Sequence, residues 1–388
     1  MTSIAKRAAM SLANWRTAPH NAWSFQHVAE FVPTATIQTR TPDSERTVAE
    51  GALRELRVPG RDGGQIPLET HFRDSHTDGF VALKHGATVG EWYGDHAEPE
   101  SPHVVFSVSK SITAVLAGIA AADGRLDVSA PVTAYVPEIT GSAYGDATVR
   151  DLLDMVVSVD FDEAYLDADG AFDRYRRAML WNPARPDQPE ENMVGFLSTL
   201  RKAGHQHGVR FHYVSPNTDM LGLVVERAAG MRFPTYLAER LWGPMGATGS
   251  AYVTVDRAGS SRAAGGICIT VADLARLGQL ILDGGRTADG AQVVPAAWIE
   301  DIRTKGDRQA WVDGNFFYMF PDGRYRSCWY DVGDGRGSFC AIGIHGQWLW
   351  VDPTSRVVLA KTSSLPEPSD DPTALHEIKV LGEIARTL

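Results

Sequence analysis

The chain has 388 residues, 44% of them hydrophobic and 22% charged, which is enough to bury the core of one large domain or of two interleaved ones. Its formal net charge of -11 argues against nucleic-acid and anionic-membrane partners, because both bind basic surfaces. Three unclustered cysteines, Cys268, Cys328 and Cys340, imply neither a disulfide framework nor a thiolate metal site. No apolar run has the length of a secretory or membrane-spanning segment, so we expect a cytoplasmic protein.

The first clear structural pattern is a β-hairpin followed by a buried helix. Phe80–Lys84 and Val89–Tyr93 have the composition of two strands joined by a turn at His85 and Gly86. After a polar loop, the segment Ile112–Ala122 contains no charge and is nearly all apolar, and Gly124 provides a stop. These features predict a helix that is buried on all sides and packs against a sheet.

A serine and a lysine, Ser107 and Lys110, stand one turn apart at the start of this helix. Burial makes a lysine costly unless it has a local partner or a lowered pKa. A serine beside such a lysine, at the positive end of a helix, can become a nucleophile. The alternative is a helix-capping serine beside a solvated lysine. The short pattern leaves both interpretations open, and it also occurs at Ser3–Lys6, where no buried helix follows.

The middle of the chain, residues 126–249, shows helices and long loops but no strand pattern. Thr148 precedes a short amphipathic helix, Met220–Ala229 forms an apolar stripe that ends at Gly230, and residues 160–190 are irregular and polar. Strand patterns return at residues 250–255 and 328–361, before a last helix over residues 372–388. We therefore predict an α/β protein of the α+β type. Residues 1–125 and 250–388 form an antiparallel sheet flanked by helices, residues 126–249 form a helical insert, and the active site lies at the seam.

Tyr213 is a candidate partner for the serine and the lysine, because it lies in a polar loop between two predicted helices. Unperturbed lysine and tyrosine titrate near about 10.4 and 10, so either needs a shift of about three units, or roughly 4 kcal/mol, to act as a base at neutral pH. Burial and a neighbouring cation can supply such a shift. The residues alone do not decide whether Lys110 or Tyr213 is the base.

Four segments in one order resemble the penicillin-recognising serine hydrolases, a superfamily with class C β-lactamases, family VIII esterases and D-aminopeptidases. Within it, the chain resembles the nylon-oligomer hydrolases in particular, from about residue 15 to the end. The resemblance implies a β-lactamase/DD-peptidase-like fold and an acyl-enzyme mechanism. The segments are Ser107–Lys110, Tyr213–Asn217, Gly265–Gly266 followed by Asp273–Gly278, and Gly343–Gln347.

This resemblance assigns roles to individual residues. Ser107 is the acylated nucleophile, and Lys110 and Tyr213 share its proton. The backbone N–H groups of Ser107 and Ile344 form the oxyanion hole, where loss of one donor typically costs about 10²–10³ in rate. Tyr165 matches a tyrosine that closes over the substrate and assists amide cleavage.

Several positions differ from the patterns of these relatives. Ser215 stands where class C enzymes carry an asparagine, and His345 stands in their Lys-Thr-Gly region, so the chain does not resemble a β-lactamase in its substrate contacts. Ala264 replaces an asparagine of the nylon-oligomer hydrolases. Their aspartate for the substrate amino group falls in a divergent loop, where Asp173 is one candidate and an ungapped match gives Arg176. The expected substrate-binding set is Tyr165, Asp173, Trp181, Ser215, Ala264, Tyr330 and His345.

The resemblance thus implies a hydrolase of small linear amides, with 6-aminohexanoate oligomers as the leading substrate. A family VIII-type carboxylesterase with little amidase activity is the alternative among enzymes, and a catalytically idle binder of peptides or cell-wall fragments is the alternative from another class. We expect no cofactor and no metal, because His205, His207 and His212 lie in a glycine-containing loop that lacks the helical glutamate spacing of a zinc enzyme. Relatives suggest a homodimer, although the sequence itself does not define the oligomeric state.

Overall fold

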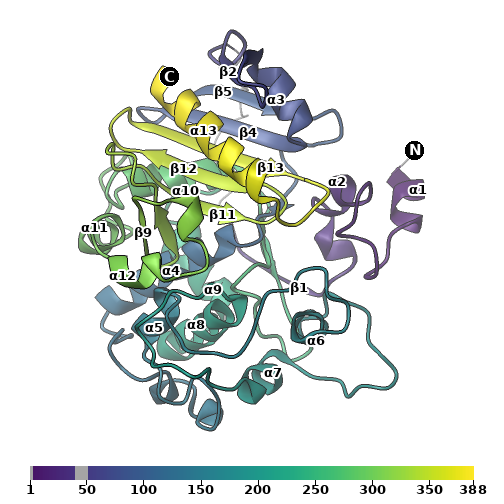
Figure 1. Cartoon of the computed structure of the whole chain (residues 1–388), viewed down its shortest axis with the longest axis vertical. Coiled ribbons are helices and arrows are strands. Elements are labelled where there is room, and N and C mark those ends of the chain that lie inside the picture. Colours follow the sequence, from purple (N-terminus) through teal and green to yellow (C-terminus); the bar gives the residue numbers. More distant parts are fainter. Residues whose placement is uncertain (1–2, 40–50) are drawn as a thin grey trace.

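The computed structural model describes residues 3–39 and 51–388. The largest sheet is antiparallel and has seven strands, in the order β5-β4-β13-β12-β11-β10-β9 (Figure 1). It pairs a hairpin from the N-terminal part of the chain with strands from the C-terminal part. The expected hairpin is confirmed, with Phe80 opposite Trp92. The strands of this sheet are β4 (Thr77–Lys84), β5 (Ala87–Tyr93), β9 (Arg324–Arg326), β10 (Trp329–Asp331), β11 (Phe339–Gly343), β12 (Gln347–Asp352) and β13 (Val357–Ser363).

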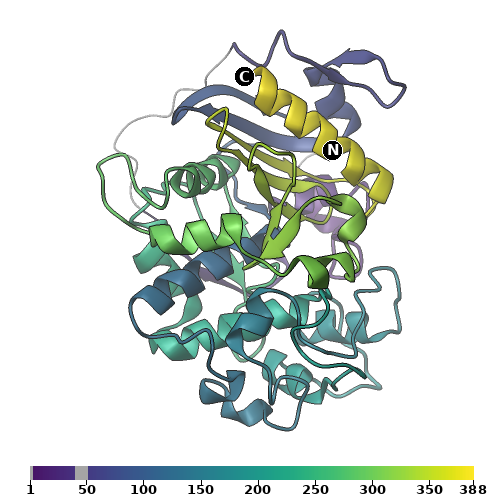
Figure 2. The same ribbon diagram turned by 60° about the vertical axis from the view of Figure 1, so that its left-hand side comes forward.

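Helices cover both faces of this sheet, which explains why its central strands β4, β12 and β13 are buried on both faces and not only on alternate residues. On one face α10 (Val271–Leu282) packs against β4, β12 and β13. The last helix, α13 (Asp371–Thr387), lies across the opposite face, as Figure 2 shows. Every residue of β13 is buried as a result.

The predicted buried helix is α4 (Val108–Ala122), which lies between the sheet and the helical part of the chain. All of its residues from Val108 to Ala120 are buried, because small and branched side chains allow close packing on every side. The helix contacts β11 and β12 on one side and α8 (Ser215–Ala229) on the other. Gly124 follows its C-terminus with a φ of 70°, so the expected stop is confirmed.

Between β6 (His103–Val104) and β7 (Tyr252–Thr254) the described chain forms helices and loops without a strand. Thr148 caps α5 in a capping box with Asp151, and Gly230 ends α8 in the left-handed conformation, as the sequence predicted. The division into residues 1–125 with 250–388 and an insert of 126–249 stays a prediction. The helices of this part are α5 (Val149–Leu153), α6 (Ala171–Ala178), α7 (Met193–Thr199), α8 and α9 (Phe233–Leu237), with the short turns η2 (Val132–Ala134), η3 (Pro137–Ile139) and the π-helical η4 (Ala238–Trp242).

Helix α6 departs from the expectation that residues 160–190 are irregular. Its apolar face consists of Phe172, Tyr175 and Ala178, at a helical spacing of three residues. Charged residues surround these three positions in the sequence, so the periodicity is too brief to stand out. Packing of this face against the core selects the helix.

Two smaller sheets complete the strands. A four-stranded antiparallel sheet has the order β1-β7-β8-β6 and leads from β6 directly into the start of α4, whereas a two-stranded ribbon lies near α3 and α13. Their strands are two or three residues long, and β7 (Tyr252–Thr254) lies within the strand pattern predicted for residues 250–255. The remaining elements are α1 (Ser3–Ala8), α2 (Asn21–Ser24), η1 (Val28–Glu30), β1 (Thr34–Thr36), β2 (Arg57–Pro59), β3 (Gln65–Pro67), α3 (Leu68–Asp74), β8 (Ile267–Ile269), α11 (Ala296–Thr304), α12 (Arg308–Val312) and η5 (Phe317–Met319).

Among the described helices, none combines the length and the apolar character that a membrane crossing requires.

The packing of α10 on the sheet depends on Gly278. A Cβ atom at this position would lie 2.5 Å from Val358 Cγ1 and 2.8 Å from Leu349 Cδ1. We expect Gly278→Ala to lower the free energy of unfolding by about 1–2 kcal/mol, because overpacking costs about 1–3 kcal/mol and alanine returns up to ~1 kcal/mol of helix propensity. Denaturant unfolding followed by circular dichroism measures this change.

Gly382→Ala is the matched control, since Gly382 is also helical but its nearest neighbours are side-chain atoms of the flexible Arg386, at 3.3 Å. The control should be neutral or slightly stabilising. Equal unfolding free energies for the two variants would contradict the packing argument.

Candidate active site

The backbone turns sharply just before α4. Phe106 has a φ of 42°, which is unusual for a bulky residue and costs of order 1–3 kcal/mol. The ring of Phe106 is buried against Phe25 at a centroid distance of 4.9 Å and against His345 at 5.3 Å, and this packing holds the turn. The turn places Ser107 at the N-cap of α4 without a capping hydrogen bond from its side chain. The geometry therefore argues against the helix-capping role and leaves the hydroxyl facing the cavity.

Lys110 is buried directly beneath this serine, with 1% of its surface exposed. Its Nζ donates to Ser107 Oγ at 2.8 Å, to Ser215 Oγ at 2.9 Å and to the Ala264 carbonyl at 2.8 Å. The three acceptors come from α4, the start of α8 and the turn before β8. Together they satisfy all three hydrogens of an ammonium group.

The ionisation of Lys110 reflects opposing effects. Burial lowers the pKa of its amine to about 8, and the Arg262 guanidinium also lowers it. The carboxylates of Glu163 and Asp219 raise the pKa and limit the shift. A substantial fraction of the amine is therefore neutral near physiological pH and can accept a proton.

Tyr213 lines the same cavity as Ser107. The side chains of Ser107 and Tyr330 lie near enough to its hydroxyl to lower the pKa of the phenol. Its ring packs on Phe316 at 4.9 Å, and Lys110 Nζ lies 5.0 Å from the ring centroid. Burial is the main cause that raises the pKa of the Tyr213 phenol well above its usual value, so the resting side chain holds its proton.

Two backbone N–H groups point to an oxyanion hole. Within the described residues, neither the Ser107 nor the Ile344 amide donates a hydrogen bond to another group of the chain. Ile344 follows Gly343, where a Cβ atom would lie 2.6 Å from the Val105 carbonyl oxygen, so glycine lets β11 approach the nucleophile turn. This close approach brings the two amide donors to the same region.

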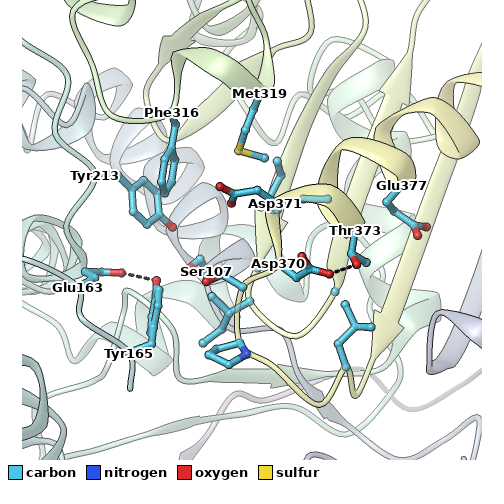
Figure 3. Close-up of a pocket in the computed structure, with 18 of the residues that line it drawn as sticks. Ser107, Glu163, Tyr165, Tyr213, Phe316, Met319, Asp370, Asp371, Thr373 and Glu377 are labelled. Carbon is cyan, nitrogen blue, oxygen red and sulfur yellow. Dashed lines mark hydrogen bonds between the residues drawn. The ribbon is translucent and has the colours of Figure 1, made fainter. Parts of the chain in front are cut away.

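Ser107 opens into a cavity of about 530 Å³. Figure 3 shows the serine with Tyr213, Tyr165 and Glu163 on one side and with residues of the start of α13 on the other. Apolar and aromatic side chains form much of the wall, including Phe316, Met319, Ile342, Trp348 and Leu365. Of the residues expected from the sequence, the cavity brings together Ser107, Tyr165, Tyr213, Tyr330 and Ile344.

Two further expected residues touch Lys110 rather than the cavity. Ser215 and Ala264 supply two of the three acceptors for its amine. The serine at position 215 therefore contributes its hydroxyl to the surroundings of Lys110. At position 264 the acceptor is the backbone carbonyl, which is present whatever the side chain.

The other expected substrate contacts lie behind the cavity wall. Trp181 is buried, packs against Phe106 and donates from its indole to Thr254 Oγ1 at 3.1 Å. His345 is buried, and burial lowers the pKa of its imidazole to about 3, so the ring is neutral. Asp173 accepts hydrogen bonds from Arg177 and Asn182. None of the three is among the residues that line the described cavity.

Sequence reasoning missed Glu163. One oxygen of its carboxylate accepts a hydrogen bond from the Ser215 N–H and the other from the Tyr165 hydroxyl, and the residue lines the cavity. It thereby connects the Tyr165 loop to the start of α8 and places a negative charge near Lys110. Its position two residues before Tyr165, in an acidic loop, was the only signal in the sequence.

The cavity also carries a marked excess of carboxylates. Its one lining lysine, Lys361, is buried and paired with Glu377 at 2.7 Å. The remaining lining carboxylates have no lysine or arginine among the residues that line the cavity. They are Asp162, Glu163, Asp370 and Asp371.

No cluster of three or more histidine, cysteine, aspartate or glutamate residues in residues 3–39 and 51–388 is arranged to hold a metal ion. Two of the three histidines considered in the sequence lie beside a carboxylate: His207 Nε2 is 3.0 Å from Asp146 and His212 Nε2 is 3.5 Å from Asp162.

Comparisons with known proteins show the family of the chain. The Beta-lactamase family profile matches residues 68–383. The chain is 37% identical to the 6-aminohexanoate-dimer hydrolase of Paenarthrobacter ureafaciens over 381 residues, which cover 97% of this chain and 94% of that protein.

Solved structures share the fold. A provisionally assigned 6-aminohexanoate-dimer hydrolase from Bacillus anthracis superposes with a TM-score of 0.87 at 24% identity, over 98% of this chain and 97% of that one. A family VIII carboxylesterase superposes with a TM-score of 0.58 at 14% identity, over 81% and 95% of the two chains. From the extent of the profile match and the identity over nearly the whole length, we conclude that the chain belongs to the Beta-lactamase family of hydrolases.

Proposed function

We propose that the chain is a serine hydrolase that cleaves small linear amides through an acyl-enzyme on Ser107, with 6-aminohexanoate oligomers as the leading substrate. The observation that carries the proposal is the 2.8 Å hydrogen bond between Ser107 Oγ and the buried amine of Lys110, whose pKa is about 8. A buried amine that is partly neutral, beside a hydroxyl open to a cavity, is a competent base and nucleophile.

Lys110 is the base that starts the reaction. When its amine is neutral, two N–H bonds donate to the Ala264 carbonyl and to Ser215, and the lone pair is directed to Ser107 Oγ. Lys110 takes the hydroxyl proton while the oxygen attacks the amide carbonyl carbon. The Ser107 and Ile344 amides stabilise the resulting oxyanion.

Tyr213 completes the proton path. Because its phenol is protonated at rest, it can give its proton to the leaving nitrogen as the C–N bond breaks and recover one from Lys110. Water then hydrolyses the acyl-enzyme by the reverse path, with Ser107 regaining its proton. No net proton is gained or lost by the enzyme.

The cavity supports a linear substrate with a free amino group. Its walls are largely apolar, and its carboxylates favour a cation over an anion. A 6-aminohexanoate oligomer combines an aliphatic chain with an ammonium end. The relative from Paenarthrobacter ureafaciens, which bears the name 6-aminohexanoate-dimer hydrolase, supports the same substrate class.

A carboxylesterase is the second candidate, and one observation favours it. The Tyr165 hydroxyl donates to Glu163 and is therefore not available to an amide nitrogen in this arrangement. An alcohol leaving group needs less assistance than an amine, so the same site would cleave esters more readily than amides.

Removal of the nucleophile should abolish activity. We expect Ser107→Ala to reduce hydrolysis of the linear 6-aminohexanoate dimer and of a short-chain nitrophenyl ester to the background rate. Intact mass after incubation with a fluorophosphonate should show one adduct on the wild-type chain and none on the variant. A wild-type enzyme that cleaves the ester rapidly but leaves the dimer intact would favour the carboxylesterase, and an unlabelled wild-type Ser107 would favour a binding protein.

The pH dependence of kcat/KM should reflect the ionisation of Lys110. A protonated Lys110 cannot accept the serine proton, so we expect kcat/KM to fall with decreasing pH below about 8 and to level off above it. Lys110→Arg keeps the charge but cannot lose its proton, and should lower kcat/KM by roughly 10²–10⁴ at every pH. Stopped or continuous assays from pH 6 to 10 measure both effects. An acid limb in the wild type that lies below pH 6 would rule out Lys110 as the base.

The carboxylates at the start of α13 should favour an ammonium group. We expect the double variant Asp370→Asn, Asp371→Asn to raise KM for a substrate with a free amine about fivefold per charge removed, or roughly 1 kcal/mol each. The N-acetylated form of the same substrate serves as the control and should show an unchanged KM. Equal changes in KM for the two substrates would show that these carboxylates do not recognise the charge of the substrate.

A further inference from the structure

The carbonyl of Ala264 is one of the three acceptors around Lys110, and it belongs to a turn far from α4 in the sequence. Thr113 Oγ1 of α4 donates to the neighbouring Ala263 carbonyl at 3.0 Å, which ties the turn to the nucleophile helix. The direction of the Ala264 carbonyl decides where one N–H bond of Lys110 points. It therefore also decides where the lone pair of the neutral amine points.

One face of α8 is built against this turn. Ser215, Asp219 and Gly222 lie at helical spacings of four and three residues and so share a face. Ser215 accepts a hydrogen bond from Lys110, and Asp219 accepts one from the Ala264 N–H at 2.8 Å. A Cβ atom at Gly222 would lie 2.4 Å from Ala263 Cβ, so only glycine lets the helix come this close.

Asp219 is fully buried, and each oxygen of its carboxylate has partners. Oδ1 accepts from the Ala264 N–H, whereas Oδ2 accepts from the Tyr175 hydroxyl and lies 3.8 Å from Arg262 Nη1. Arg262 is itself 4% exposed, and its Nε and Nη1 have no hydrogen-bond partner. Burying a carboxylate this completely is costly, and it does not touch the cavity or the reacting serine.

We propose that Asp219 is a positioning residue for the reaction at Ser107: it holds residue 264 so that the Ala264 carbonyl receives Lys110 and the amine faces the nucleophile. This inference deepens the proposed function and rests on it. Asp219 acts through the backbone of residue 264, and the buried charges of Asp219 and Arg262 set the field around the amine.

The charges that face Lys110 define the expected pH effect. They are the carboxylates of Glu163 and Asp219 and the guanidinium of Arg262, and the neutral groups that complete the surroundings are the buried Cys328 thiol and the hydroxyls of Ser107, Ser215 and Tyr213. Asp219 favours the ammonium form, while Arg262 opposes it. Neutralising Asp219 therefore leaves the positive charge of Arg262 less compensated, which lowers the pKa of Lys110. The acid limb of the kcat/KM profile, where activity falls as Lys110 is protonated, should then move to lower pH.

Two substitutions distinguish the effect of Asp219 on the position of residue 264 from the effect of its charge on Lys110. Asp219→Ala removes the acceptor for the Ala264 N–H, and we expect the rate of Ser107 acylation by a short-chain nitrophenyl ester to fall about 100-fold, since a misplacement of the order of 1 Å can cost that much. Asp219→Asn keeps an amide oxygen for the same N–H. It should retain acylation within about tenfold of the wild type and shift the acid limb to lower pH.

Asp273→Asn is the matched control. Asp273, in the first turn of α10, is likewise a buried helical aspartate that accepts a hydrogen bond from a backbone N–H, that of Gly249 at 2.8 Å, but it has no contact with Lys110. We expect this variant to lower the melting temperature without moving the acylation rate or the acid limb. Acylation rates are normalised to the folded fraction measured by circular dichroism.

The outcomes are decisive for Asp219. Normal acylation by folded Asp219→Ala, or an acid limb of Asp219→Asn that coincides with that of Asp273→Asn, would overturn the inference. If Asp219→Ala does not fold, the acid limb of Asp219→Asn decides. Acylation of Ser107 in the wild-type enzyme tests the proposed function. The ratios of the acylation rates of the variants to that of the wild type test the role of Asp219, so a failure of one can be told from a failure of the other. A wild-type Ser107 that is not acylated would overturn both.

Discussion

The buried amine of Lys110 is the interaction on which the rest of the site depends. A lysine with 1% exposure is tolerated only because three acceptors from three different elements surround its Nζ. The same burial lowers the pKa of the amine to about 8, so the group whose burial costs folding energy is suited to the role of base in the proposed reaction. The apolar, small-residue composition of α4 is what makes this degree of burial achievable.

Several features of the fold maintain this arrangement. The strained Phe106 is locked by aromatic packing and presents Ser107 to the cavity. Gly343 lets the end of β11 approach the nucleophile turn, and Gly222 lets α8 approach the turn at residue 263. Aromatic packing and two close approaches at glycines therefore fix where the reactive groups lie.

Much of the architecture could be predicted from local patterns. The hairpin of β4 and β5, the buried helix, the capped α5 and the tail strands each carry several residues of consistent periodicity. Strands β6 and β9 and helix α6 could not be predicted, because two or three strand residues, or three apolar residues among charges, are too few to define a period. Their conformation depends on the neighbours against which they pack.

The sequence by itself placed Ser107 and Lys110 one turn apart at the start of a buried helix, since its apolar run and its spacing are local patterns, and the structure showed that the two side chains are paired. The sequence offered Tyr213 as a candidate partner and the resemblance to known hydrolases added Tyr165, and the fold brings both to the same cavity. Only the tertiary structure decided that Glu163, Asp219 and the Ala264 carbonyl surround the lysine, and that Asp173, Trp181 and His345 lie behind the wall. These contacts join segments up to about 150 residues apart, and their geometry follows from how helices pack, which no local periodicity encodes.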